Sequence, residues 1–189
     1  MNIANKFTVL RVILIPLFVA FLLIDKLPYN YLIALAIFGI ASITDAIDGH
    51  IARSRNMITS FGKFLDPLAD KALVVSALIC LVELKWTWSV LVIVIVLREF
   101  LVTSLRLVAS SSSGEVIAAS FWGKLKTVTQ MIAICCILAF GAFEDFFGTQ
   151  WHSIFYIVAI ILMSVAALFT VVSGIDYIIK YKHYIDTTK

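Results

Sequence analysis

The sequence predicts an all-α integral membrane protein with six transmembrane helices and a short amphipathic helix at its start. Hydrophobic residues make up 62% of the 189 residues and charged residues only 14%, against about 25% charged in ordinary soluble domains. Apolar runs long enough to cross ~30 Å of hydrocarbon recur along the whole chain. This composition excludes a soluble globular domain, a disordered chain and a disulfide-stapled secreted module. We expect membrane lipids around the protein and no nucleic-acid partner.

The expected spans fill the chain as one membrane-embedded domain, residues 1–189. They cover about residues 8–24, 31–47, 65–82, 86–108, 121–143 and 151–179. Residues 25–28 and 144–148 are expected to be turns, and the serine-rich residues 109–115 a flexible polar linker. Residues 1–7 alternate apolar and polar side chains, which suits an interfacial helix that leads into the first span. A frayed terminus accounts for this last pattern equally well.

The basic residues predict the orientation of the spans. Six spans put both termini on one side of the membrane, and every Lys and Arg except Lys26 and Lys85 falls on that side. Because basic residues gather in cytoplasmic loops, we expect both termini on the cytoplasmic side. Arg98 and Glu99 fall inside the fourth span, and charges within a membrane call for a functional or structural reason.

Four aspartates form the most informative pattern. Asp45 and Asp48 are three residues apart at the end of the second span, and Asp66 and Asp70 are four apart at the start of the third. On helices these spacings put each pair on one face. Antiparallel helices would then bring the two pairs together near the cytoplasmic interface. Oxygen ligands alone favour a hard cation such as Mg²⁺, Mn²⁺ or Ca²⁺ over zinc.

Other interpretations of these aspartates stay open. One or two of them can cap helices and pair with basic neighbours, although capping does not account for four at helix-face spacing. A divalent-cation transporter also uses carboxylates within the membrane. Such a protein, however, should place them near the midplane on discontinuous helices, and here they gather at one edge.

The same segment resembles the signature of the CDP-alcohol phosphotransferase family, DxxDGxxAR(x8)GxxxDxxxD, and agrees with it at every fixed position from Asp45 to Asp70. Three flanking elements resemble those of the bacterial branch that uses sn-glycerol 3-phosphate. They are the NxxTxxR pattern from Asn5 to Arg11, the Arg98-Glu99 pair and the GKxKT pattern from Gly123.

The resemblance implies a metal-dependent phosphatidyl transfer and a six-span fold in a bacterial cytoplasmic membrane. The donor would be CDP-diacylglycerol, the acceptor sn-glycerol 3-phosphate, and the products phosphatidylglycerophosphate, a precursor in phosphatidylglycerol and cardiolipin synthesis, and CMP. One or two Mg²⁺ or Mn²⁺ ions would be bound by Asp45, Asp48, Asp66 and Asp70, with Asp70 as the general base. The residues implied at the nucleotide are Asn5, Thr8, Gly49, Ala52, Arg53 and Gly62. The resemblance also implies a homodimer with its active site on the cytoplasmic side.

The phosphate of the acceptor needs a cationic pocket. Its candidates on the fourth and fifth spans are Arg98, Arg106, Lys124 and Lys126. The two lysines suit plain membrane anchoring as well, and Arg98 suits a structural ion pair with Glu99 or Asp176. Serine, inositol phosphate or phosphatidylglycerol as acceptor would keep the chemistry and change the product.

Overall fold

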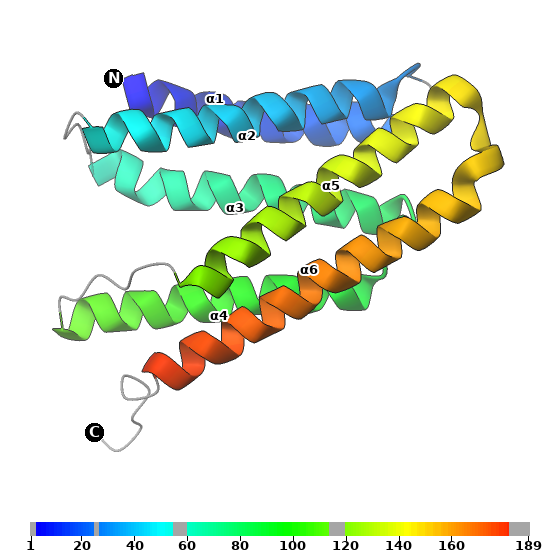
Figure 1. Ribbon diagram of the computed structural model, residues 1–189. Coiled ribbons are helices and arrows are strands. Elements are labelled where there is room, and N and C mark those ends of the chain that lie inside the picture. The colour runs from blue at the N-terminus through cyan, green and yellow to red at the C-terminus, as the bar shows by residue number, and fades with distance from the viewer. Residues whose placement is uncertain (1–2, 25–26, 55–59, 114–119, 182–189) are drawn as a thin grey trace. The chain divides into compact units, whose positions relative to one another are not determined.

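The computed structural model describes residues 3–24, 27–54, 60–113 and 120–181. For residues 3–8, 45–54, 60–68, 70 and 107–113 it describes the backbone but not the side chains. Over these ranges the chain is helical and contains no strand. The elements are α1 (Ile3–Leu23), α2 (Asn30–Ser54), α3 (Ser60–Glu83), α4 (Ser89–Ser113), α5 (Phe121–Phe147), the 3₁₀ helix η1 (Thr149–Trp151) and α6 (His152–Tyr181) (Figure 1).

Each expected span coincides with one of the six long helices, but several boundaries were predicted wrongly. The interfacial helix expected over residues 1–7 is not a separate element, because α1 runs unbroken from Ile3. Residues 109–113, which were expected in a linker, are helical, since α4 ends only at Ser113. Hydropathy detects only the apolar part of a helix, whereas a helix once formed extends through polar residues at small cost.

The turn expected over residues 144–148 is also shorter than predicted. Helix α5 continues through the acidic residues to Phe147 and stops only at Gly148. Gly148 has a φ of 84°, in the left-handed region that glycine adopts without steric cost. The glycine, and not the two preceding acidic residues, therefore ends the helix.

The described chain divides into two compact units. The first unit comprises residues 1–84 and 134–155, and the second comprises residues 85–133 and 156–189. Helix α5 therefore contributes its first half to the second unit and its second half to the first. The first unit holds α1, α2 and α3, and the second holds α4 and most of α6.

In the first unit, α1 packs against both α2 and α3, and the three helices run alternately in opposite directions (Figure 1). Phe18 of α1 and Phe38 of α2 are fully buried with their ring centroids 5.8 Å apart. Where α2 begins, Asn30 Nδ2 donates to the carbonyl of Leu22 at 3.1 Å. These contacts fix how far α1 and α2 overlap along their length.

In the second unit, α6 presents a face of small residues to its neighbours. Ala159, Ala166, Ser173 and Gly174 are among its buried positions, and small residues let helix backbones approach closely within a membrane. Trp122 of α5 stacks on Phe169 of α6 with centroids 6.3 Å apart. Near the start of α4, Trp88 Nε1 donates to the Tyr156 hydroxyl at 3.0 Å.

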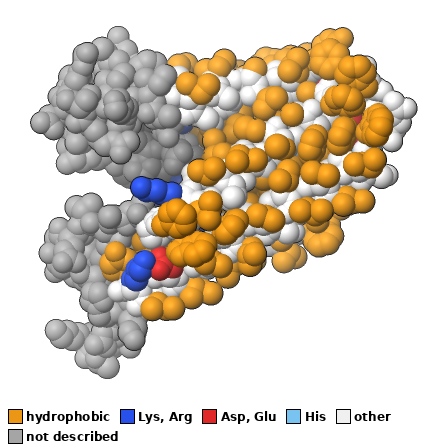
Figure 2. Space-filling view, in the orientation of Figure 1, with side chains coloured by type: hydrophobic (Ala, Val, Ile, Leu, Met, Phe, Trp, Pro, Cys, Tyr) orange, Lys and Arg blue, Asp and Glu red, His pale blue; other side chains and the backbone are white. Residues whose placement is uncertain are grey.

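Large hydrophobic side chains cover much of the described surface, as the face in Figure 2 shows. Along α6 alone, Ile157, Ile161, Leu168, Ile175 and Ile179 are each more than half exposed, a pattern that water would not favour. Within the described residues, α5 and the segment Thr149–Tyr181 are long and apolar enough to cross a membrane. That all six helices cross it stays a prediction.

Candidate functional site

The signature segment is helical at both ends. Helix α2 extends to Ser54 and α3 begins at Ser60, so that only residues 55–59 fall between them. In this regular helix, Asp45, Asp48 and Ala52 share one face of α2, while Gly62, Asp66 and Asp70 share one face of α3. The helical spacing on which the metal hypothesis depends is therefore present in the backbone. The side chains of these residues lie outside the described part of the structure.

The buried positions show which face of α2 carries the signature. Ala34, Phe38 and Ala41 are fully buried, and steps of four and three residues continue this face to positions 45 and 48. On α3, Ala69 and Leu73 are buried and lie three residues after positions 66 and 70. Both pairs of acidic positions thus continue the faces by which their helices pack inside the unit.

The expected nucleotide residues gather at the same end of the first unit. Asn5 and Thr8 lie in the first turns of α1, which is at the same end as the last turns of α2 and the first turns of α3 (Figure 1). The expected set comprises Asn5, Thr8, Gly49, Ala52, Arg53 and Gly62. Their side chains lie outside the described residues, so their contact with a nucleotide stays a prediction.

Arg11 is a residue whose importance the sequence interpretation missed, although it ends the NxxTxxR pattern. Its side chain is only 2% exposed. The contacts of Leu22 with Asn30 and of Phe18 with Phe38 fix the antiparallel register, and counting back along α1 puts Arg11 level with residues 41–45 of α2. A buried guanidinium requires a counter-charge nearby.

That counter-charge is available in the signature. The described acidic residues elsewhere in the first unit are Glu83, Glu144 and Asp145, and they lie in the last turns of α3 and α5. Arg11 lies twelve residues before the end of α1, about 18 Å along the helix at 1.5 Å per residue. Position 45 of the α2 backbone lies level with Arg11 by the antiparallel register of α1 and α2. That Arg11 offsets part of the negative charge of the aspartates stays a prediction, because the aspartate side chains lie outside the described residues.

The residues expected to bind the acceptor phosphate belong to the second unit. Arg98 Nη1 lies 3.1 Å from Glu99 Oε1, and Arg98 Nη2 donates to Ser173 Oγ. Lys126 Nζ donates to the same Glu99 oxygen. The ion pair that the sequence left open for Arg98 is therefore formed with Glu99. Asp176 instead pairs with Lys180, its carboxylate oxygen 2.8 Å from Nζ.

Tyr177 connects the second arginine to this group. Arg106 Nη2 donates to the Tyr177 hydroxyl, and the backbone N–H of Ser120 donates to the same oxygen at 3.1 Å. The guanidinium carbons of Arg98 and Arg106 lie 5.6 and 5.1 Å from the centroid of the Tyr177 ring. We call Arg98, Glu99, Arg106, Lys126 and Tyr177 the cationic cluster.

The cationic cluster includes three of the four expected acceptor residues. Lys124, the fourth, is exposed in the first turn of α5, which suits the anchoring role of an interfacial lysine. The sequence interpretation missed Tyr177, because a tyrosine within an apolar span carries no signal of its contacts. Tyr177 is only 1% exposed, and this burial follows from packing that the sequence alone does not show.

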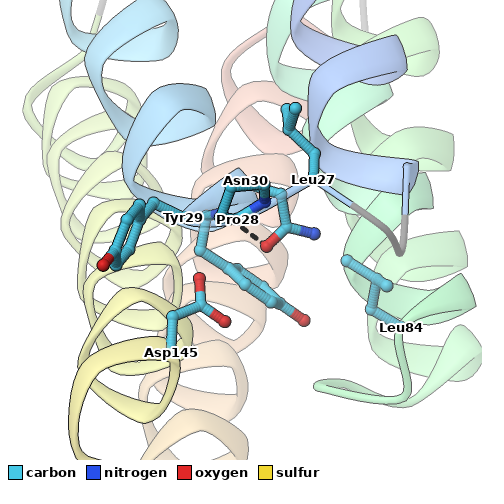
Figure 3. Close-up of a pocket in the computed structure, with 7 residues that line it drawn as sticks. Leu27, Pro28, Tyr29, Asn30, Leu84 and Asp145 are labelled. Carbon is cyan, nitrogen blue, oxygen red and sulfur yellow. Dashed lines mark hydrogen bonds between the residues drawn. The ribbon is translucent and has the colours of Figure 1, made fainter.

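A pocket of the first unit lies elsewhere. It is lined by the turn between α1 and α2, from Leu27 to Tyr31, together with Leu84 and Asp145 (Figure 3). Asn30 in this pocket is fifteen residues from Asp45 along α2, which is about 22 Å at 1.5 Å per residue. Of the residues that line the pocket, only Asp145 is charged. The pocket is therefore separate from the signature.

The described side chains contain no group of three acidic, His or Cys residues that could hold a metal, and the side chains of the four aspartates are not among them. The donor set nevertheless fits Mg²⁺ or Mn²⁺, because it consists of carboxylate oxygens at helix-face spacing. It does not fit zinc, which prefers nitrogen and sulfur.

Comparison with known proteins adds independent evidence. The family profile described as CDP-alcohol phosphatidyltransferase matches residues 1–174. The chain is 42% identical over 190 residues to the CDP-diacylglycerol–glycerol-3-phosphate 3-phosphatidyltransferase of Bacillus subtilis, covering 95% of this chain and 94% of that one. It is 39% identical to the Haemophilus influenzae protein of the same name, over 94% and 91% of the two chains. It is also 39% identical to a probable phosphatidylglycerophosphate synthase of Mycobacterium tuberculosis, over 95% and 81%.

Proposed function

The chain belongs to the CDP-alcohol phosphatidyltransferase family, and from this premise we propose that it transfers a phosphatidyl group from CDP-diacylglycerol to sn-glycerol 3-phosphate. The products are phosphatidylglycerophosphate and CMP. The observation that carries the proposal is the complete aspartate signature on two helices, in a chain similar along nearly its whole length to proteins named for this reaction. The family favours this activity over the transport of divalent cations.

The chemistry assigns a role to each group of residues. The hydroxyl oxygen of the acceptor attacks the phosphorus that carries the diacylglycerol, the bond from that phosphorus to CMP breaks, and CMP leaves. Asp70 accepts the hydroxyl proton. An unperturbed aspartate has a pKa of about 3.9, so the proton is transferred late, as the new bond forms.

Asp45, Asp48 and Asp66, with Asp70, would hold one or two Mg²⁺ or Mn²⁺ ions, which when bound neutralise charge on the pyrophosphate. Gly49, Ala52 and Gly62 leave room beside the backbone of α2 and α3 for a ligand to approach. Arg53 can bind a phosphate through two parallel hydrogen bonds. The nucleotide and the leaving phosphate thus lie at the end of the first unit that carries the signature.

The cationic cluster supports a phosphorylated acceptor. Arg98, Arg106 and Lys126 carry three positive charges and Glu99 one negative charge, so that the cluster has a formal charge of +2. A phosphate monoester carries about −1.5 to −2 at pH 7. Serine offers no such charge. The cluster therefore favours glycerol 3-phosphate over serine, while inositol phosphate would satisfy the same requirement.

The chain is a membrane protein by its family and by the apolar helices α5 and α6. We propose further that all six helices span a bacterial cytoplasmic membrane, with both termini and the active site on the cytoplasmic side. This placement keeps the acyl chains of the donor in the bilayer and exposes its nucleotide to water. We also propose that the enzyme is a homodimer, as the family resemblance implies.

The test is an assay of purified protein with CDP-diacylglycerol, Mg²⁺ or Mn²⁺, and each candidate acceptor in radiolabelled form. We expect lipid product and CMP with glycerol 3-phosphate, and none with serine or inositol phosphate. Asp70→Asn should abolish turnover and largely keep nucleotide binding, whereas the matched control Asp145→Asn, outside the signature, should keep both. Product from another acceptor alone would overturn the assigned substrate. Full turnover by Asp70→Asn would overturn the general base.

A further inference from the structure

We propose that Tyr177 is a positioning residue, which holds Arg98 and Arg106 together so that their guanidinium groups bind the phosphate of the acceptor. The proposal rests on the proposed function and deepens it, since it names the residue that organises the acceptor site. Tyr177 of α6 contacts both α4 and the residue before α5 in the second unit. Its ring contacts two arginines of α4, and its hydroxyl bonds to α4 and to the residue that precedes α5.

Two arginines on one aromatic ring need an explanation. Their guanidinium carbons lie 5.6 and 5.1 Å from the ring centroid, within the ~6 Å over which a ring attracts a cation. The attraction of one ring does not cancel the repulsion of two like charges close together. Glu99 offsets only one charge, and Lys126 shares it. The arrangement is therefore complete only when an anion joins it.

Among the described residues, the acidic neighbour of Tyr177 does not supply that anion. Asp176, the acidic residue next to Tyr177, pairs with Lys180. The buried Nε of Arg98 has no hydrogen-bond partner in the described part of the chain, and its side chain is 10% exposed. A buried N–H without a partner is uncommon and marks a place where a ligand or water completes the structure.

The residues around the cluster fit a positioning role. Gly174 faces the Arg98 side chain, and a Cβ there would lie 3.1 Å from Arg98 Cγ. Ser173, on the adjacent turn of α6, accepts a hydrogen bond from Arg98 Nη2. Arg98 is thus fixed by α6 on one side, and Tyr177 fixes Arg106 from the same helix. A fixed pair of guanidinium groups binds a phosphate better than two mobile ones, because less conformational entropy is lost on binding.

Tyr177→Phe tests the proposal, because it keeps the ring and removes the hydroxyl that accepts from Arg106 and Ser120. We expect KM for glycerol 3-phosphate to rise about tenfold, in the range for a hydrogen bond to a charged group, while KM for CDP-diacylglycerol stays within about twofold. Inhibition by inorganic phosphate, competing with the acceptor, should weaken by a similar factor. Tyr156→Phe is the matched control, since it loses one hydrogen bond to Trp88 in the same unit and should change none of these values.

Ser173→Ala provides a second variant in case Tyr177→Phe folds poorly, and it should also raise the acceptor KM selectively. Equal changes in both KM values, or an unchanged acceptor KM with either variant, would overturn the positioning role. If the wild-type protein makes no lipid from glycerol 3-phosphate, the proposed function fails instead. In that case, the thermal stabilisation of wild-type and Tyr177→Phe protein by inorganic phosphate still tests the cluster, and equal stabilisation would contradict the inference.

Discussion

Gly141 of α5 provides a sharp test of the packing in the first unit. A Cβ added at Gly141 would lie 2.5 Å from both Cγ and Cε1 of Tyr31, and closer still to Cδ1. Carbon atoms in contact lie about 3.5–4.0 Å apart, so the ring would have to move by about 1 Å or more. The backbone that carries the ring is held in place, because the N–H of Tyr31 donates to Asn30 Oδ1 at 2.8 Å and Asn30 Nδ2 donates to the carbonyl of Leu22.

The expected magnitude follows from two opposing effects. Overpacking a filled site costs about 1–3 kcal/mol, and the clash with several ring atoms places Gly141→Ala at the upper end. Replacing glycine by alanine inside a helix returns about 0.5–1 kcal/mol. The net loss is therefore about 2 kcal/mol, which corresponds to a fall in Tm of about 4–8 °C for a chain of this size.

Gly39 of α2 is the matched control, because a Cβ there would meet no described atom within 4 Å beyond its chain neighbours and the adjacent backbone of its own helix. Gly39→Ala should raise Tm slightly, by the helix-propensity gain alone. Melting can be followed in detergent with a thiol-reactive fluorogenic dye, since Cys80 is 3% exposed in the folded chain. If Gly141→Ala melted at or above the wild-type temperature, the packing of Tyr31 on α5 would be wrong. Adding Tyr31→Ala to Gly141→Ala should recover part of the loss.

Two further predictions concern buried charge. Arg11→Met removes the counter-charge that we place level with Asp45, so the metal-free protein should melt lower and Mg²⁺ should raise its Tm more than that of the wild type. The Mg²⁺-induced rise in Tm of Arg11→Lys should lie between those of the wild type and Arg11→Met. An equal rise for all three proteins would contradict the expected pairing of Arg11 with the aspartates. Glu99→Gln leaves Arg98 and Lys126 without their shared carboxylate, which costs about 3 kcal/mol for a mostly buried pair and should lower Tm. Glu144→Gln, whose ion-pair partner His152 is 52% exposed, should lower Tm less.

The sequence predicted the helical spacing of the four aspartates, while their role in a site stays a prediction, and it named three residues of the cationic cluster without the contacts that join them. Asp45 to Asp70 form a local pattern, in which helical spacing alone defines a face. By contrast, Arg98 and Lys126 meet at Glu99 from two different helices, and Tyr177 is far from both in sequence. Sequence proximity predicted only the contact between Arg98 and Glu99. Which residue of a distant helix completes such a group is decided by packing, which periodicity does not encode.

The helix boundaries show a related limit. Hydropathy predicted that the second span ends near residue 47, and the helix continues to Ser54. The sequence therefore located the apolar part of α2 and missed the helical extension that carries Ala52 and Arg53. A continuous helix keeps Ala52 on the face that begins with Ala34 and Phe38.

The reaction joins two anions, and their charges would be neutralised by two different groups of residues, the metal-binding aspartates and the cationic cluster. In the proposed reaction, the four aspartates would bind the cation that the donor pyrophosphate requires, whereas Arg98, Arg106 and Lys126 would bind the acceptor phosphate directly. Acceptor binding should therefore not require the metal. We expect EDTA to abolish turnover reversibly, while glycerol 3-phosphate still raises the Tm of the chelated protein. Loss of that stabilisation on chelation would show that the metal, and not the cationic cluster, holds the acceptor phosphate.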